Sequence, residues 1–393
     1  MLPGFLAASL APRIDDDFAF GASELGLAVG AFYAVCAAAS SPCGHLVERI
    51  GAVAAVRASA AATLICALAV ALLAQSAAAL IVALLVGGVG NAAAAPAAGA
   101  LVSHHVAAER KGMALGAMQA GAPLGSVLSG LALPAIAIPF GWRWAYVVVG
   151  ALALLAAAAP PATPRPDARA GGRPRRGLTP VHVLAITAAL ASGATMGLVS
   201  FLVLYGVDTG MSEAAAGAVL AAMSVSAVLS RIAVGAVSDR TGRDPERTVA
   251  VMLAVSAAGY LMLLAGEPAA VVAGALLVGS VGWAWPAALT VAAVRRAPEA
   301  PAWAVGVLMS GLFLGAIAGP LLVGVLVESA GSYVPAWLAT ATLAMLAAAT
   351  IGATASGGLP RGLPRAPRWS RRERTTARGA ARSNRPRRAP PAG

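Results

Sequence analysis

The segment GAVSDRTGR at residues 235–243 has a counterpart 191 residues earlier, the segment GHLVERIG at residues 44–51. Both segments contain a glycine, an acidic residue four positions later, an arginine directly after the acid, and a second glycine. Each segment follows an apolar run that is long enough to cross a bilayer as a helix. A turn repeated after corresponding apolar runs predicts a membrane chain built from two homologous halves.

The composition agrees with a membrane chain. Of the 393 residues, 59% are hydrophobic and only 11% are charged, and the mean hydropathy is +0.80. Soluble domains contain about 25% charged residues, so the composition argues against a soluble globular enzyme. The apolar runs are continuous and do not alternate with polar residues, which predicts helices and argues against a β-barrel.

Eleven apolar runs have the length of a membrane span, at residues 24–46, 53–74, 77–102, 112–139, 142–160, 180–205, 213–237, 248–266, 269–293, 303–328 and 333–355. A twelfth run, residues 1–11, is too short to cross a membrane unaided and lacks the basic segment of a signal peptide. We number the spans in chain order with residues 1–11 as span 1, so that residues 112–139 are span 5 and residues 303–328 are span 11. We interpret Met1 as a late start and predict that part of helix 1 is missing.

A segment rich in Pro, Gly and Arg divides the runs into six and six. We therefore predict an N-terminal six-helix bundle at residues 1–160, a cytoplasmic linker at 161–180 and a C-terminal six-helix bundle at 181–355. The remaining residues, 356–393, contain eleven arginines and one glutamate. Such a tail cannot bury a core, so we expect it to be disordered and attracted to anionic lipid. Nothing beyond its charge supports nucleic-acid binding.

The loops differ in charge from side to side. If the spans number twelve, 25 of the 28 Lys and Arg residues lie on the side of the linker and tail. Positive charge stays in the cytoplasm, which places both termini there and predicts a multi-pass protein of the plasma (inner) membrane. The opposite loops are acidic and contain Asp15, Asp16, Asp17, Asp208, Glu213, Glu267 and Glu328.

The repeated turn resembles the cytoplasmic loop motif of major facilitator superfamily transporters. Its residues are Gly44, Glu48, Arg49 and Gly51 in the first copy, and Gly235, Asp239, Arg240, Gly242 and Arg243 in the second. The first copy departs from the family pattern, because Glu48 replaces the usual Asp, and Ala52 and Val53 stand where basic residues are usual. The resemblance implies an all-α fold of two six-helix bundles with pseudo-two-fold symmetry, alternating access, H⁺ as the coupling ion and a monomer.

The physical role of the turn is electrostatic. A carboxylate at the end of one helix can face the positive N-terminus of a neighbouring helix, and glycines let the two helices approach closely. Such contacts would latch one half against the other when the cavity faces outward. The alternative is an ordinary turn with arginines retained on the cytoplasmic side.

Spans 5 and 11 each combine glycines with a proline, at Gly121, Pro123 and Gly125 and at Gly315, Gly319 and Pro320. Proline permits a kink in a spanning helix, and glycines at four-residue spacing permit close packing. Span 5 is loosely similar to the glycine–proline motif of antiporter branches of the superfamily. The alternative is simple small-residue packing.

Polar and aromatic residues inside spans are the candidates for a substrate cavity, because polar groups are costly in lipid. The candidates are Asn91, Gln119, Thr195, Ser200, Tyr205, Trp283 and Trp285. By the resemblance, spans 1, 4, 7 and 10 line the cavity. Each candidate is equally well interpreted as a satisfied interhelical contact. Arg231 lies two helical turns before Asp239, and we expect its side chain to snorkel to the cytoplasmic interface.

No Asp or Glu lies near the middle of a span, so the family's usual proton-coupling residues are not carried over. The sequence also contains no metal-ligand set, catalytic triad or phosphate-binding loop, which predicts neither an enzyme nor a cofactor. We predict a proton-coupled efflux carrier for a small neutral or amphiphilic molecule. The alternatives are an uptake symporter or uniporter, and a non-transporting sensor or scaffold on a carrier fold.

Overall fold

The computed structural model describes residues 1–18, 20, 22–158 and 179–356. The helices form one compact unit, Met1–Ala355, and Ser356–Gly393 is a separate unit. Residues 161–178 of the predicted linker (161–180) and residues 357–393 of the predicted tail (356–393) lie outside the described residues.

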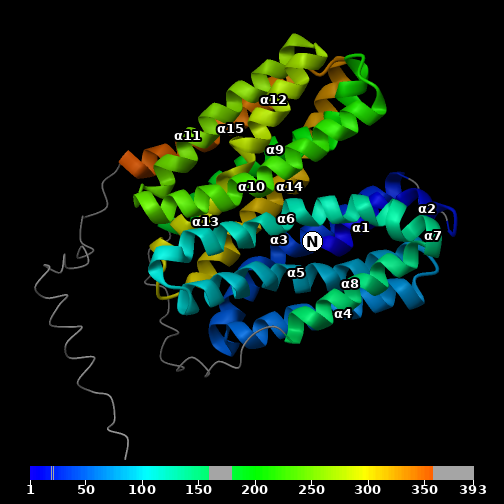
Figure 1. Ribbon diagram of the computed structural model, residues 1–393, viewed down its shortest axis with the longest axis horizontal. Coiled ribbons are helices and arrows are strands. Elements are labelled where there is room, and N and C mark those ends of the chain that lie inside the picture. The colour runs from blue at the N-terminus through cyan, green and yellow to red at the C-terminus, as the bar shows by residue number, and fades with distance from the viewer. Residues whose placement is uncertain (19, 21, 159–178, 357–393) are drawn as a thin grey trace, which may run out of the picture. The chain divides into compact units, whose positions relative to one another are not determined.

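The described residues form helices and no strands, which confirms the predicted all-α polytopic fold. The first half contains α1 (Leu2–Ser9), α2 (Ala11–Asp15), α3 (Ala22–Ile50), α4 (Ala52–Leu73), α5 (Ala77–His105), α6 (Lys111–Ala132), α7 (Ile138–Phe140) and α8 (Trp142–Ala158). The second half contains α9 (Thr179–Asp208), α10 (Glu213–Thr241), α11 (Pro245–Met262), α12 (Pro268–Ser280), α13 (Trp285–Arg296), α14 (Pro301–Ala330) and α15 (Val334–Ser356). Figure 1 shows the two halves as two groups of helices.

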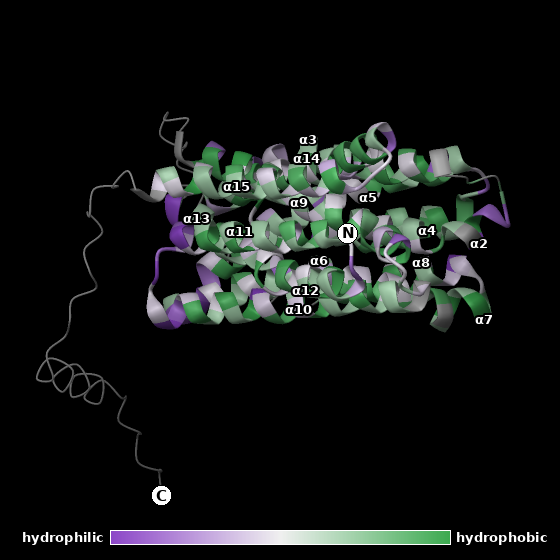
Figure 2. Cartoon of the chain, turned by 90° about the horizontal axis from the view of Figure 1, so that it is seen from above, coloured by the Kyte–Doolittle hydropathy of each residue, from purple (hydrophilic) through white to green (hydrophobic). Residues whose placement is uncertain are grey.

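Over the described residues, nine helical stretches are long and apolar enough to cross a membrane, and α8 is a shorter apolar helix. Figure 2 shows apolar residues along the helices and hydrophilic residues near their ends. Two predicted spans are interrupted. A π-helical turn at Leu133–Ala137 separates α6 from α7, and a 3₁₀ turn at Gly282–Ala284 separates α12 from α13.

The halves contact each other through α3 with α14 and α6 with α10. At these crossings any side chain in place of glycine would collide with backbone of the other half. A Cβ on Gly44 would lie 2.7 Å from the carbonyl oxygen of Ala302, and one on Gly112 would lie 2.5 Å from that of Gly235. Only glycine permits such an approach, so these positions hold the two halves in backbone contact.

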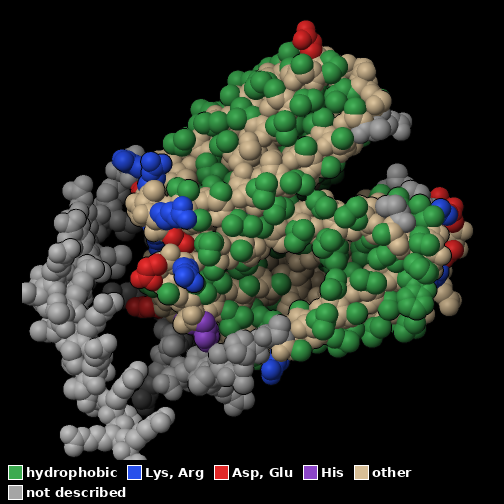
Figure 3. Space-filling model, in the orientation of Figure 1, with side chains coloured by type: hydrophobic (Ala, Val, Ile, Leu, Met, Phe, Trp, Pro, Cys, Tyr) green, Lys and Arg blue, Asp and Glu red, His purple; other side chains and the backbone are tan. Residues whose placement is uncertain are grey.

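The crossings lie at one end of the unit, which we call the basic end because Arg49, Arg110, Lys111, Arg240, Arg243 and Arg295 lie there. Figure 3 shows Lys and Arg side chains gathered at this end and a notch between the halves at the opposite end. Away from the basic end, Gly30 of α3, Gly121 of α6 and Gly217 of α10 have open space where a Cβ would lie. The halves therefore touch at the basic end and separate toward the other.

Helix α14 also packs against α9 within the second half, through a row of glycines. Gly311, Gly315 and Gly319 each meet backbone of α9, at Ala185, Ala189 and Gly193 respectively. Pro320 lies inside the same helix directly after this row. The glycines of span 11 thus make an intra-bundle contact in this structure.

A buried ion pair joins three helices of the second half at the basic end. The Nε and Nη2 atoms of Arg296, on α13, donate to the two carboxylate oxygens of Glu246, on α11, at 2.7 and 2.6 Å. The side chains of this pair are only 7% and 10% exposed. The hydroxyl of Thr354, on α15, donates to the same carboxylate at 3.2 Å.

We expect Glu246→Gln to lower the Tm of the purified protein in detergent by several degrees. The substitution removes the carboxylate charge from a buried guanidinium, and breaking a buried ion pair costs about 3–5 kcal/mol. The matched control is Glu299→Gln, because Glu299 is exposed at the same end; its Tm should stay within about one degree of the parent. Equal losses for both variants would contradict the stabilising role of the pair.

Candidate functional site

A cavity lies between the two halves. Its empty volume is about 710 Å³, which includes the part that is open to solvent. Most of its wall is apolar. The lining residues are Met1, Phe5, Tyr33, Gln119, Ala122, Ser126, Ser192, Thr195, Met196, Val199, Arg231, Trp283, Trp285, Pro286, Met309, Leu312, Phe313 and Ala316. They come from α1, α3, α6, α9, α10, α14 and the break between α12 and α13, so both halves contribute.

The helix break in span 10 places two indoles at the cavity. Trp283 lies in the 3₁₀ turn, and Trp285 and Pro286 begin α13. Proline at the start of a helix loses no backbone hydrogen bond, since its missing N–H would be unpaired there. The break therefore has a local cause in the sequence, and it directs both tryptophans of the Trp-Ala-Trp-Pro segment to the cavity.

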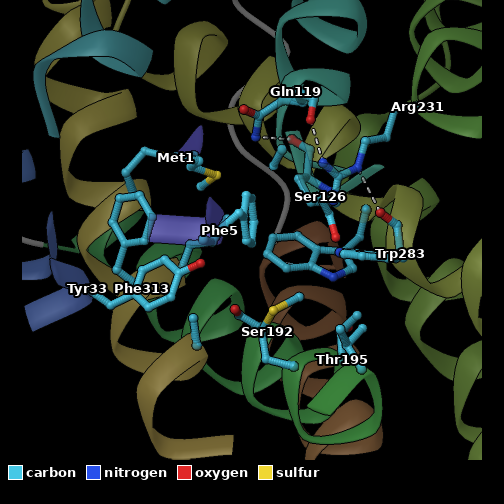
Figure 4. A pocket seen from close by; sticks show the side chains of 18 residues that line it. Met1, Phe5, Tyr33, Gln119, Ser126, Ser192, Thr195, Arg231, Trp283 and Phe313 are labelled. Atoms are coloured by element: carbon cyan, nitrogen blue, oxygen red, sulfur yellow. Dashed lines mark hydrogen bonds between the residues drawn. The ribbon is translucent and has the colours of Figure 1, made fainter. Parts of the chain in front are cut away.

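Among the described residues that line the cavity, Arg231 has the one charged side chain, and this side chain is buried, since the residue is only 3% exposed. Its Nε donates to the carbonyl oxygen of Trp283 at 3.0 Å, and its Nη1 donates to that of Gln119. Its guanidinium carbon lies 5.5 Å from the centre of the Trp283 ring. Figure 4 shows Arg231 and Gln119 on one side of the cavity, with Tyr33 and Phe313 across from them.

The expectation that Arg231 snorkels to the cytoplasmic interface is wrong. Helix α10 continues to Thr241, ten residues further, which places the end of the helix about 15 Å away along its axis. The backbone of Arg231 also packs directly on Gly116 of α6. The side chain is therefore enclosed between the halves, too far from the end of α10 to reach the interface there.

Four of the seven predicted cavity residues line the cavity: Gln119, Thr195, Trp283 and Trp285. The Nε2 of Gln119 donates to the carbonyl oxygen of Pro286 at 3.4 Å. The hydroxyl of Thr195 donates to the carbonyl oxygen of Ala191 at 2.9 Å. These two bonds tie the polar wall to neighbouring backbone.

The other three predicted residues lie elsewhere. Asn91 accepts a hydrogen bond from the nitrogen of Met1 at 2.6 Å and donates to the sulfur of Cys36 at 3.3 Å. Tyr205 donates to the carbonyl oxygen of Leu263 and packs its ring on Tyr333 and Trp337. The remaining one, Ser200, is exposed and outside the cavity wall.

Some lining residues were not predicted from the sequence. Tyr33 and Phe313 stack across the two halves, with ring centroids 6.0 Å apart. They were missed because an aromatic residue within an apolar run gives no signal about which way it faces. Arg231 did give a signal, since it is a lone charge inside a span.

The indole nitrogen of Trp285 has no hydrogen-bond partner among the described residues. The side chain is 1% exposed and lines the cavity. Buried Trp N–H groups usually find an acceptor, so this donor is available to a molecule inside the cavity.

The acids of the repeated turn cap helices of the opposite half at the basic end. The two carboxylate oxygens of Asp239, at the end of α10, accept from the backbone N–H groups of Gly112 and Met113 at 2.7 and 2.8 Å. One carboxylate oxygen of Glu48, at the end of α3, accepts from the N–H of Ala302 at 2.7 Å. These N–H groups open α6 and α14, where the helix itself supplies no acceptor.

The other residues of the repeated turn have distinct positions. The first glycines, Gly44 and Gly235, lie at the helix crossings described above. The second glycines, Gly51 and Gly242, have φ of +87° and +61° and form the turns after α3 and α10. The side chains of Arg49, Arg240 and Arg243 are exposed at the basic end.

Span 5 places its glycine–proline residues differently. Pro123 is buried inside α6 and Gly125 lies against the ring of Phe5 of α1. Around Gly121 there is open space. The close approach of α6 to the other half therefore occurs earlier in the helix, at Gly112 and Gly116.

Acids near the opposite end do not reach the cavity wall. The side chains of Arg143 and Trp142 donate hydrogen bonds to Asp17 and hold the pKa of that carboxyl below its usual range. Asp15 accepts from the N–H of Phe20 at 2.8 Å. Within the described residues, no group of three or more His, Cys, Asp or Glu side chains could hold a metal ion.

The sequence matches the family model described as the Major Facilitator Superfamily, over residues 1–255 and again over 184–387. No curated protein sequence matches the chain. Among solved structures, it is similar to the Escherichia coli fucose:proton symporter FucP, with 16% identity, a TM-score of 0.73 and coverage of 89% of this chain and 94% of that one. The human organic anion transporter MFSD10 gives 16% identity, a TM-score of 0.71 and coverage of 89% and 96%. The proton:xylose symporter XylE gives 14% identity, a TM-score of 0.69 and coverage of 90% and 93%.

We expect Gly116→Val to destabilise the contact between the halves, because its side chain would collide with the carbonyl oxygen of Arg231. Forcing extra atoms into a packed contact costs about 1–3 kcal/mol, so Tm in detergent should fall. Gly130→Val is the matched control in the same helix, since a Cβ added at Gly130 would meet no atom within 4 Å. If Gly130→Val lowered Tm as much as Gly116→Val does, the cause would be the replacement of glycine by valine within a helix and not the contact between the halves.

Proposed function

The chain belongs to the Major Facilitator Superfamily and is therefore a secondary transporter rather than an enzyme. We propose that it exports a small neutral or amphiphilic molecule. Transport would proceed by alternating access and would be coupled to protons. Two six-helix halves, residues 1–160 and 181–355, rock about the cavity that both of them line. The repeated turns act as the latch of one end, and the residues around the cavity bind the substrate.

The observation that carries this proposal is the reciprocal capping at the basic end. Glu48 of the first half caps α14 of the second, and Asp239 of the second half caps α6 of the first. Hydrogen bonds to a charged group contribute about 1.5–3 kcal/mol each, which is enough to bias a two-state equilibrium. A cavity closed at one end by breakable polar contacts is what alternating access requires.

The cavity wall supports the proposed substrate class. Aromatic and aliphatic side chains form most of it, and polar contacts are few and concentrated around Arg231 and Gln119. Such a wall suits a molecule with an apolar body and few polar groups. It suits a phosphate ester or a dicarboxylate poorly, because those would need several donors at once.

Proton coupling and export are the finer parts of the proposal. FucP and XylE are named as proton symporters, which supports H⁺ as the coupling ion. The candidate proton carriers are the acids near the opposite end, Asp15 to Asp17 and Asp208. Export rests on the loose antiporter likeness of span 5 and on the apolar cavity; uptake by symport or uniport is the alternative direction.

A function from another class is a non-transporting sensor or scaffold on the carrier fold, with residues 356–393 as its output. The discriminating property is flux, because a sensor binds its ligand without moving it.

The proposed carrier acts as a monomer, with anionic lipid near the Arg-rich tail.

We also propose that the basic end faces the cytoplasm of a plasma (inner) membrane, by the positive-inside rule. A green fluorescent protein fused after Gly393 should be fluorescent, and an alkaline phosphatase fused at the same point should be inactive, because both termini would be cytoplasmic. Fusions after Gly210, between α9 and α10, should give the reverse pattern. Active phosphatase at the C-terminus would overturn this orientation.

The latch predicts the effect of Asp239→Asn on flux. Proteoliposomes containing the purified full-length chain should move radiolabelled phenylacetamide or phenylacetate faster than protein-free liposomes when a pH jump is imposed. Asp239→Asn should reduce the initial protein-dependent rate about tenfold or more, because it weakens the cap on α6. Glu48→Gln should reduce the rate in the same way.

Glu299→Gln is the control for the latch, because Glu299 is exposed at the same basic end and, among the described residues, caps no helix of the opposite half; this variant should leave the rate unchanged. Unchanged flux in Asp239→Asn would count against the latch. Binding of either probe without flux in the parent protein would favour the sensor.

A further inference from the structure

Arg231 is a buried cation without a counter-charge. Its two hydrogen bonds go to backbone carbonyl oxygens, those of Trp283 and Gln119, and no Asp or Glu is among the residues that line the cavity. A guanidinium has five N–H donors, so most of them remain available. Burying an unpaired charge is costly, and an anion inside the cavity would remove that cost.

A second buried donor lies in the wall of the same cavity. The indole N–H of Trp285 is unpartnered among the described residues, and its side chain is 1% exposed. It comes from the same helix break as Trp283, the residue whose carbonyl oxygen holds the Arg231 guanidinium. One charged and one neutral donor thus line the cavity without a side-chain acceptor of their own.

Helix packing does not explain why position 231 is an arginine. The 191-residue offset between the halves places Ser40 at the corresponding position of α3. The backbones of Arg231 and Ser40 play the same role, since each packs on a glycine of the opposite half, Gly116 and Gly306 respectively. A serine is enough for this crossing in the first half, so the guanidinium serves another purpose in the second.

The rest of the wall limits the anion. Phe5, Tyr33, Leu312 and Phe313 offer apolar surface to the remainder of a ligand. The one cationic side chain in the described wall balances one negative charge, so a phosphate monoester or a dicarboxylate would bring a second charge that no other side chain in the wall balances. A planar carboxylate matches the fork of a guanidinium.

We propose that Arg231 and Trp285 form an anion subsite in the cavity, and that it binds the carboxylate of an organic monoacid with an apolar body. The inference rests on the proposed function and narrows its substrate class to amphiphilic monoanions. The guanidinium bonds the carboxylate, the indole N–H bonds one of its oxygens, and the aromatic side chains of α1, α3 and α14 cover the apolar part.

The test is equilibrium binding to the purified full-length protein, followed by tryptophan fluorescence and thermal shift. The probes are phenylacetate and hexanoate, each compared with its neutral amide, phenylacetamide and hexanamide. We expect both acids to bind and to raise Tm, and each amide to bind at least about tenfold more weakly. Equal binding of acid and amide would overturn the proposal. So would no binding of either acid at about 10 mM, because a ligand with a Kd of about 1 mM would nearly saturate the site at that concentration.

The variants separate the two donors. Arg231→Gln should weaken phenylacetate binding about 10- to 100-fold, which corresponds to the loss of hydrogen bonds from a charged group, and should leave phenylacetamide binding unchanged. Trp285→Phe keeps the ring and removes the N–H, and we expect a loss of about two- to tenfold. Arg57→Gln is the matched control, because Arg57 is exposed on α4, and it should bind like the parent.

The outcomes distinguish this inference from the proposed function. Charge-selective binding that depends on Arg231, without flux in proteoliposomes, would uphold the subsite and reject the carrier. Flux of a neutral amphiphile that Arg231→Gln leaves intact would uphold the carrier and reject the subsite. If Arg231→Gln fails to fold, Trp285→Phe together with the acid–amide comparison on the parent decides the matter.

Discussion

The architecture depends on helices of opposite halves meeting backbone to backbone at one end. At the basic end, glycines remove the side chains that would hold α3 from α14 and α6 from α10. Close approach then brings the acid at the end of one helix to the first N–H groups of the other, which have no acceptor within their own helix. Because the halves touch there, they diverge toward the opposite end, and the space between them becomes the cavity.

Much of this could be read from the sequence, because it depends on local chemistry repeated at a fixed offset. A glycine four residues before an acid places both on one face of a helix, so the crossing and the cap belong to a single signal. The fold class follows from the lengths of the apolar runs and from the family resemblance. The partner helix of each cap could not be read, since Asp239 and Gly112 are 127 residues apart and only the tertiary arrangement joins them.

The site was less predictable, because rotation of a helix about its axis decides which residues face the cavity. In an all-apolar span the hydrophobic pattern does not specify that rotation: α9 is apolar all round, and Thr195 faces the cavity while Ser200 does not. Arg231 was misjudged for a related reason. Its distance from Asp239 along the chain suggested the interface, but the neighbouring helix closes over that stretch of α10 and leaves its side chain between the halves.

The same helix, α10, links the cavity to the proposed latch. Arg231 and Asp239 both lie on α10, which is continuous from Glu213 to Thr241, and eight residues separate them by about 12 Å along its axis. A rigid helix cannot move one of these residues without moving the other. Arg231 holds backbone of α6 and of the break in span 10, while Asp239 holds the start of α6. In the proposed carrier, a ligand that draws the guanidinium away from those carbonyl oxygens would therefore act on the helix pair that closes the basic end, and α10 would join substrate binding to reopening of that end.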